Sequence, residues 1–164
     1  MKNYSQSVCI LILILFATVS SAQAEGLKTE KSDIAVDFKL QDLSQNMLSL
    51  SSYRGKQPVL LIFWTTLCPF CLQAVKRLNQ IYPKLVKAGY ELLAINVEEP
   101  VSKVNNFVKK YALVFKVLLD KDAAVAQTYG VVGVPTYILV DRSGSINYKG
   151  NNFPEELLNG SPSE

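Results

Sequence analysis

The chain has 164 residues, enough for one domain but not comfortably for two once a targeting segment is set aside. Lys and Arg number 17 against 14 Asp and Glu, without a basic block, so the charge does not favour nucleic acid or an anionic membrane surface as a partner. Apolar residues make up 49% of the chain, which is enough for a core. The chain has no histidine. This excludes Ser–His and Cys–His nucleophile pairs, HExxH zinc sites and the CxxCH motif of haem attachment.

The first 24 residues are typical of a secretory signal peptide. A start with one cation, Lys2, precedes an apolar stretch at Val8–Val19, about 18 Å long as a helix and shorter than the ~30 Å hydrocarbon core. An Ala-x-Ala sequence then ends at Ala24, where we expect cleavage. An uncleaved anchor is the alternative. Cys9 would leave with the signal, so residues 25–164 would enter an oxidising compartment as one domain with two cysteines.

The apolar pattern predicts alternating strands and helices in the rest of the chain. Residues 58–64 are apolar on both parities, as expected for a central strand covered on both faces. In chain order we expect a pair of short strands (37–40 and 46–50), the central strand, a helix from Pro69 that Pro83 kinks or breaks, a strand (92–97), a helix (101–111), a short strand (115–119), a short helix (123–129), a hairpin (135–140 and 145–149) and a brief helix near Pro154. This order predicts an α/β fold with a mixed sheet.

Cys68 and Cys71 stand where the central strand gives way to the first long helix. Positions i and i+3 of a helical turn lie about 5–6 Å apart, within the range that a disulfide accepts. The unpaired N–H groups at the start of the helix favour a thiolate at Cys68, whereas Cys71 would be more buried. We therefore expect Cys68 to attack a substrate disulfide and Cys71 to resolve the mixed disulfide.

Other readings of this pair are weaker. A structural disulfide that closes a four-residue loop would contribute only about 2 kcal/mol. Half of a zinc site would lack its remaining ligands, since neither a third cysteine of the mature chain nor any histidine is left. A peroxiredoxin-like peroxidase is a further alternative, because Thr65-x-x-Cys68 matches its T-x-x-C spacing, although Leu61 stands where its proline should be. A non-enzymatic binding module or metallochaperone on the same fold is the fourth.

Three motifs, in order, resemble the thioredoxin superfamily and its TlpA/ResA branch of secreted thiol-disulfide oxidoreductases. FWTTLCPFC at 63–71 is similar to the FWxxxCxxC site of the superfamily. GVPT at 133–136 resembles its cis-proline loop. VDFKLQD at 36–42, followed by LSL at 48–50 and YRGK at 53–56, is similar to the start of the branch's domain.

The resemblance runs from about residue 33 to 153 and implies a thioredoxin-like fold with the branch's extra strand–helix segment at about 90–119. It implies a cis peptide bond between Val134 and Pro135, rather than an ordinary trans proline at the start of an edge strand. The backbone of Val134 would then pair with an extended substrate segment. The expected substrate-binding rim consists of Trp64, Leu67, Pro69, Phe70, Val134 and Pro135, with Trp64 equally suited to the core.

The resemblance also implies a function and partners. We expect an extracytoplasmic, periplasmic or secreted oxidoreductase of disulfide or dithiol proteins, acting as a monomer without metal or cofactor. The branch commonly reduces its substrates, including apocytochrome c cysteines, with electrons from a membrane thiol reductase. The Pro69-Phe70 dipeptide lacks the histidine of strongly oxidising CPHC sites, which favours the reducing direction.

Two carboxylates that relatives use near the second cysteine are missing here. Ile62 replaces the acid of thioredoxins, and Ala74 replaces the glutamate of ResA-like proteins. Leu67 also replaces the tryptophan common before the first cysteine. Glu98 and Glu99 could substitute for the missing acids, but the pattern favours a solvated strand end for both.

Overall fold

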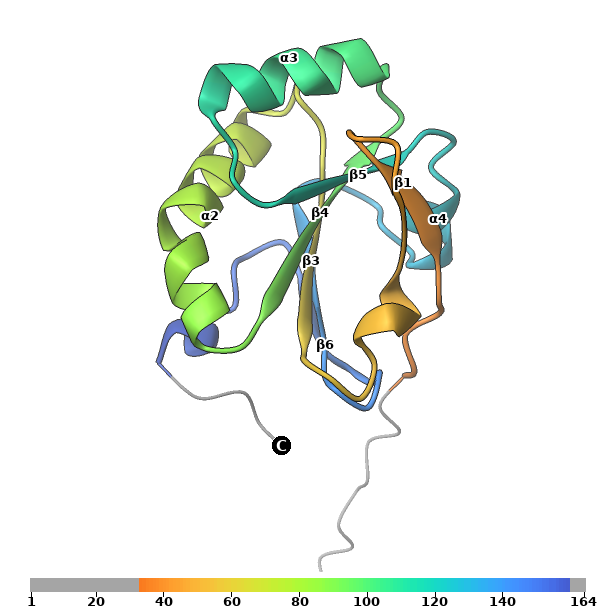
Figure 1. Cartoon of the computed structure of the whole chain (residues 1–164), viewed down its shortest axis with the longest axis vertical. Coiled ribbons are helices and arrows are strands. Elements are labelled where there is room, and N and C mark those ends of the chain that lie inside the picture. Colours follow the sequence, from red (N-terminus) through yellow and green to blue (C-terminus); the bar gives the residue numbers. More distant parts are fainter. Residues whose placement is uncertain (1–32, 160–164) are drawn as a thin grey trace, which may run out of the picture. The chain divides into compact units, whose positions relative to one another are not determined.

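The computed structural model describes residues 33–159, which form a seven-stranded mixed sheet covered by helices (Figure 1). The strand order across the sheet is β2-β1-β5-β4-β3-β6-β7. The strands are β1 (Lys39–Asp42), β2 (Met47–Ser49), β3 (Val59–Trp64), β4 (Glu91–Val97), β5 (Lys116–Asp120), β6 (Thr136–Val140) and β7 (Ile146–Gly150). The helices are α2 (Pro69–Lys87), α3 (Val101–Tyr111) and α4 (Ala124–Thr128), with 3-10 turns at Leu50–Tyr53 and Glu155–Leu158.

The central strand β3 is buried over its whole length and divides the core in two. Its even-numbered side chains, such as Ile62 and Trp64, pack with α2 and α3. Its odd-numbered side chains, such as Phe63, pack on the opposite face with Phe38 and with residues of and just after α4. Alternation along a strand places successive side chains on opposite faces, so an all-apolar strand is required here. Figure 1 shows α2 and α3 on one side of the sheet and α4 on the other.

The topology brings three loops to one end of the sheet. Strands β3 and β4 are parallel, with Trp64 opposite Asn96, so the segments that follow them emerge together. Strand β6 is antiparallel to β3, with Thr136 opposite Phe63, so the segment before β6 lies at that same end. The loop that carries Cys68 therefore meets the loop after β4 and the proline loop before β6.

The predicted elements and the mixed sheet are confirmed, with boundaries shifted by one or two residues. The exception is at Pro83, where a kink or break was expected: the helix does not break there, because α2 continues through Pro83 to Lys87. The predicted signal peptide lies outside the described residues. Within residues 33–159, no helix is long and apolar enough to cross a membrane.

Candidate active site

Cys68 is the N-cap residue of α2, directly after the loop that follows β3. Its sulfur accepts a hydrogen bond from the backbone N–H of Cys71 at 3.2 Å. Pro69 at the first helical position suits this start, because a first-turn N–H has no partner within the helix. The Cys68 side chain is partly exposed and lies 3.5 Å from the carbonyl oxygen of Val134. A helix start thus supplies a donor that stabilises negative charge on this sulfur.

Cys71, one turn further along α2, is fully buried, and both cysteines are free thiols. Burial raises the pKa of the Cys71 thiol, and the hydrogen bond with Cys68 and the charges of Cys68 and Glu99 act in the same direction. A backbone hydrogen bond from Thr65 opposes them. The two sulfurs therefore differ in access to solvent, and Cys71 is held as a neutral thiol at neutral pH.

The proline loop adopts the predicted geometry, with a cis peptide bond between Val134 and Pro135. Its backbone is held from β7 and the residue after it, Asn151, whose Nδ2 donates to the carbonyl of Pro135 at 2.8 Å. Lys149 Nζ donates to the carbonyls of Tyr129 and Gly130, just before the loop, at 2.7 and 3.0 Å. Neither contact could be predicted from the sequence, because polar residues on and just after a hairpin strand are usually solvated.

The expected apolar rim is present in part around Cys68. Leu67 and Phe70 are 77% and 70% exposed, which is unusual for large apolar side chains. Pro69 is exposed, and Val134 and Pro135 are half-buried. Val132, which was not among the residues expected in the rim, is fully exposed and lies in the segment that leads to the proline loop.

Trp64 does not lie on this rim but in the core, the second of the two places for which the sequence suited it. Its side chain is completely buried and packs against Phe107 of α3, with ring centroids 5.1 Å apart. As an even-numbered residue of β3 it faces the layer formed by α2 and α3, the same layer that buries Cys71. Trp64 thus supports the cysteine pair from within the core.

Glu99 also departs from the prediction of a solvated strand end. Its side chain is only 7% exposed and forms an ion pair with Lys103 at 2.8 Å. The carboxylate accepts hydrogen bonds from the backbone N–H and the hydroxyl of Thr66, at 2.7 and 2.6 Å, and from Asn96 at 2.8 Å. Because β3 and β4 are parallel, the second residue after β4 can reach the loop after β3. The adjacent Glu98 is exposed, as expected.

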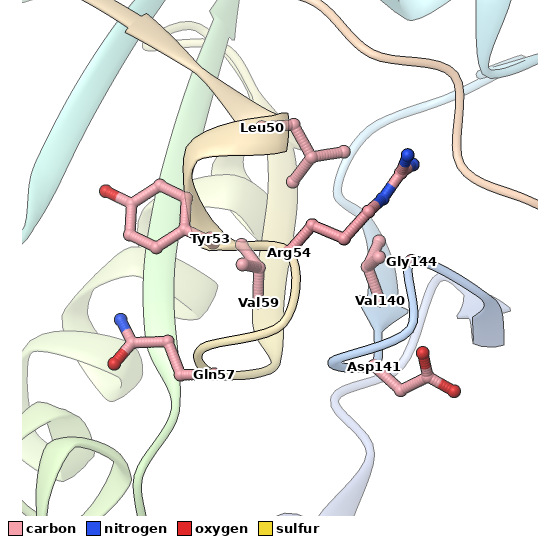
Figure 2. A pocket seen from close by; sticks show the side chains of 8 residues that line it. All are labelled: Leu50, Tyr53, Arg54, Gln57, Val59, Val140, Asp141 and Gly144. Carbon is pink, nitrogen blue, oxygen red and sulfur yellow. The ribbon is translucent and has the colours of Figure 1, made fainter.

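A small cavity lies at the opposite end of β3 and does not reach the cysteines. Figure 2 shows its eight lining residues: Leu50, Tyr53, Arg54, Gln57, Val59, Val140, Asp141 and Gly144. Its volume of about 10 Å³ accommodates one water molecule. The part of the chain that the structure describes contains no cluster of three His, Cys, Asp or Glu side chains that could hold a metal ion.

Together, a thioredoxin-type fold and a dithiol at a helix start define a class of thiol-disulfide exchange proteins. The model of the AhpC/TSA family matches residues 32–149, and the chain belongs to this family. The thiol-disulfide oxidoreductase ResA of Bacillus thuringiensis subsp. konkukian is 36% identical over 163 residues, which cover 95% of this chain and 94% of that protein. ResA of Geobacillus thermodenitrificans is 36% identical over 142 residues, or 84% of this chain and 81% of that protein.

Solved structures agree with this assignment. A putative thiol:disulfide interchange protein DsbE from Chlorobium tepidum matches with a TM-score of 0.70 and 29% identity, over 78% of this chain and 90% of that one. A secreted disulfide oxidoreductase of Mycobacterium tuberculosis, described as homologous to DsbE of E. coli, matches with a TM-score of 0.64 and 28% identity, over 74% and 92% of the two chains. The chain is a thiol-disulfide oxidoreductase of the ResA type with a Cys68–Cys71 pair.

Proposed function

We propose that this protein reduces disulfide bonds of protein substrates outside the cytoplasm, with Cys68 as the attacking and Cys71 as the resolving cysteine. The reduced pair gives up two electrons. The Cys68 thiolate attacks a substrate disulfide, a mixed disulfide forms, and Cys71 displaces the substrate thiol as the Cys68–Cys71 disulfide closes. A membrane thiol reductase would restore the dithiol.

The observation that carries the proposal is the asymmetry of the two sulfurs. Cys68 is partly exposed at a helix start and accepts the N–H of Cys71, so it can act as a nucleophile at the surface. Cys71 is fully buried, and its raised pKa keeps it protonated. A substrate can therefore reach the Cys68 sulfur. The Cys71 sulfur can react only with the mixed disulfide that forms at Cys68.

The surface around Cys68 supports a protein substrate. The exposed Leu67, Phe70 and Val132 would bury apolar area against an unfolded or extended segment. The carbonyl of Val134, next to the Cys68 sulfur, would pair with the backbone of that segment as in strand addition. Apocytochrome c cysteines before haem attachment are one substrate of this kind.

The reducing direction and the location rest on the sequence and the relatives. The Pro69-Phe70 dipeptide contains no histidine that would stabilise the reduced form. We expect a reduction potential closer to the about −270 mV of thioredoxin than to the about −120 mV of DsbA, measured by equilibration with dithiothreitol. The signal-like first 24 residues support a periplasmic or secreted location.

Peroxide reduction is the second candidate, because the AhpC/TSA family model matches this chain. A peroxidoxin of Mycobacterium tuberculosis shares the fold at 20% identity, a level that supports the fold alone. Leu61, at the position of the peroxiredoxin proline, is buried in the middle of β3. Peroxide consumption by the reduced protein, at a rate above that of free cysteine, would favour this candidate.

The Cys71→Ser variant tests the proposed function. Without a resolving thiol, Cys68 should accumulate mixed disulfides with extracytoplasmic proteins, visible on non-reducing gels and identifiable by mass spectrometry. The Cys68→Ser variant is the matched control and should trap nothing. Absence of adducts with Cys71→Ser, under conditions in which a control oxidoreductase forms them, would refute the proposal.

A further inference from the structure

Glu99 is a buried carboxylate beside the cysteine pair, and the exchange reaction described above does not use it. It lies in the loop after β4, and all its hydrogen-bond partners in the described residues surround the loop after β3 or begin α3. Burial opposes its ionisation, but the ion pair with Lys103 and the hydrogen bonds from Thr66 and Asn96 outweigh burial and hold the pKa of Glu99 below its usual value. Glu99 is therefore a fixed negative charge at neutral pH.

The contacts of Glu99 lead to both cysteines. One carboxylate oxygen holds the backbone N–H of Thr66, and the other holds its hydroxyl. Thr66 lies two residues before Cys68, and its neighbour Thr65 provides the backbone hydrogen bond that favours a thiolate at Cys71. Anchoring Thr66 thus fixes the short segment between β3 and α2 against which the two sulfurs are aligned.

Three titratable groups on separate elements face Cys71. They are Cys68 at the start of α2, Glu99 after β4 and Tyr137 of β6, whose raised pKa of about 12 leaves it uncharged at neutral pH. Lys103 of α3 faces Glu99. Cys68 and Glu99 both oppose ionisation of Cys71. When Cys68 enters a mixed disulfide it loses its charge, whereas Glu99 keeps its own.

We propose that Glu99 is a positioning residue that sets the rate of disulfide closure: its carboxylate anchors Thr66, and its negative charge restrains the attack by Cys71. This inference rests on thiol-disulfide exchange alone and not on the proposed direction or substrate. It can therefore fail while the proposed function stands, and the reverse.

A glutamine at position 99 separates the charge from the anchor. Its carbonyl oxygen can still accept from the N–H of Thr66 and from Asn96, and its amide can donate to the hydroxyl of Thr66. Only the ion pair with Lys103, which is 38% exposed and free to turn to solvent, is lost. Thr66→Val does the opposite, because it removes the hydroxyl contact and leaves the charge. Glu98→Gln, at the adjacent exposed carboxylate, is the matched control.

The experiment follows the full-length reduced protein, with Cys9→Ser in every variant so that Cys68 and Cys71 are its two thiols, in stopped flow with excess 5,5′-dithiobis(2-nitrobenzoate). In the first phase Cys68 attacks the reagent and one thionitrobenzoate leaves. In the second phase, which is independent of reagent concentration, Cys71 loses its proton to solvent and its thiolate attacks the Cys68 sulfur. The bond to the second thionitrobenzoate breaks, that group leaves as a thiolate, and the Cys68–Cys71 bond forms.

We expect Glu99→Gln to accelerate the second phase at pH 7. Each unit by which the pKa of Cys71 falls raises its thiolate fraction about tenfold and lowers the nucleophilicity of that thiolate about threefold, so the net acceleration is about threefold per unit. Thr66→Val should slow the second phase at least twofold, and Glu98→Gln should leave it unchanged. The first phase should stay within twofold in all three variants. Slowing by both Glu99→Gln and Thr66→Val, or no change with Glu99→Gln, would overturn the inference.

Discussion

At the scale of single residues, the two cysteines share a motif but have different environments. Cys68 is partly exposed at the helix start, and Cys71 is sealed under it in the layer that contains Trp64. The motif alone predicted these roles because helix geometry fixes which cysteine comes first and which lies one turn inside. The apolar side chains around Cys68 are the part of the site that a substrate would meet.

Phe70→Ser is predicted to weaken the use of protein substrates. The ring is 70% exposed, and loss of its burial against a substrate should cost about 1 kcal/mol, a roughly fivefold lower kcat/KM for insulin disulfides. The rate with a small aromatic disulfide should not change. Val86→Ser is the control, since Val86 is 51% exposed in the last turn of α2, about 24 Å along the helix. An equal loss of kcat/KM in the two variants would show that the apolar rim around Cys68 does not bind the substrate.

Residue-level predictions failed where pairing between strands decides the environment. The sequence suits Trp64 equally to the rim and to the core, and it favours a solvated strand end for Glu99. The structure buries Trp64 through its parity on β3, and it buries Glu99 because parallel β3 and β4 bring Thr66 within reach. The alternation of side chains along β3 is enough to place Trp64 in the core. No residue near Glu99 in the sequence indicates that its partner is Thr66, 33 residues earlier.

At the scale of elements, the strand ends decide where the loops go. The alternation of strands and helices was readable because each element has a clear apolar period, and the mixed sheet follows from that order. Pro83 does not break α2, since packing of the buried Leu78 and Leu85 on either side keeps the helix continuous. Tertiary packing outweighed a local helix breaker.

The short helix α4 depends on a single buried carboxylate. Asp120 at the end of β5 is fully buried and accepts hydrogen bonds from the N–H groups of Val125 and Ala126, at 3.2 and 2.8 Å. We expect Asp120→Ala to lower the free energy of unfolding by about 2–3 kcal/mol, because one buried and one part-buried donor lose their carboxylate acceptor. Urea denaturation measures this loss. Asp122→Ala, which removes one exposed contact to Ala124, should cost less than about 1 kcal/mol. A loss of that small size for Asp120→Ala would show that α4 does not need this cap.

At the scale of the whole molecule, three carboxylates link stability to pH. Burial opposes the ionisation of Asp37, Glu99 and Asp141, but hydrogen bonds to each outweigh it and hold their pKa values below the ordinary ones. Such groups stabilise the fold above the pKa of the unfolded chain, and the contribution is lost as pH falls through the lower folded value.

The free energy of unfolding of the oxidised protein should therefore be steady from pH 7 to about 5 and fall below about pH 4.5. Urea denaturation at a series of pH values measures this dependence. Glu99→Gln should fall less steeply than the wild type, because one of the three groups no longer titrates. Identical slopes for the two proteins would show that Glu99 is not ionised in a stabilising environment.

The fold exposes the Cys68 sulfur and buries the Cys71 sulfur, and alkylation measures this difference. The reduced native protein is treated briefly with iodoacetamide at pH 7, and the two cysteines are quantified in peptides by mass spectrometry. We expect Cys68 to react at least about 100-fold faster than Cys71, and urea to remove this difference in rate. Comparable rates in the native protein, or faster modification of Cys71, would contradict it.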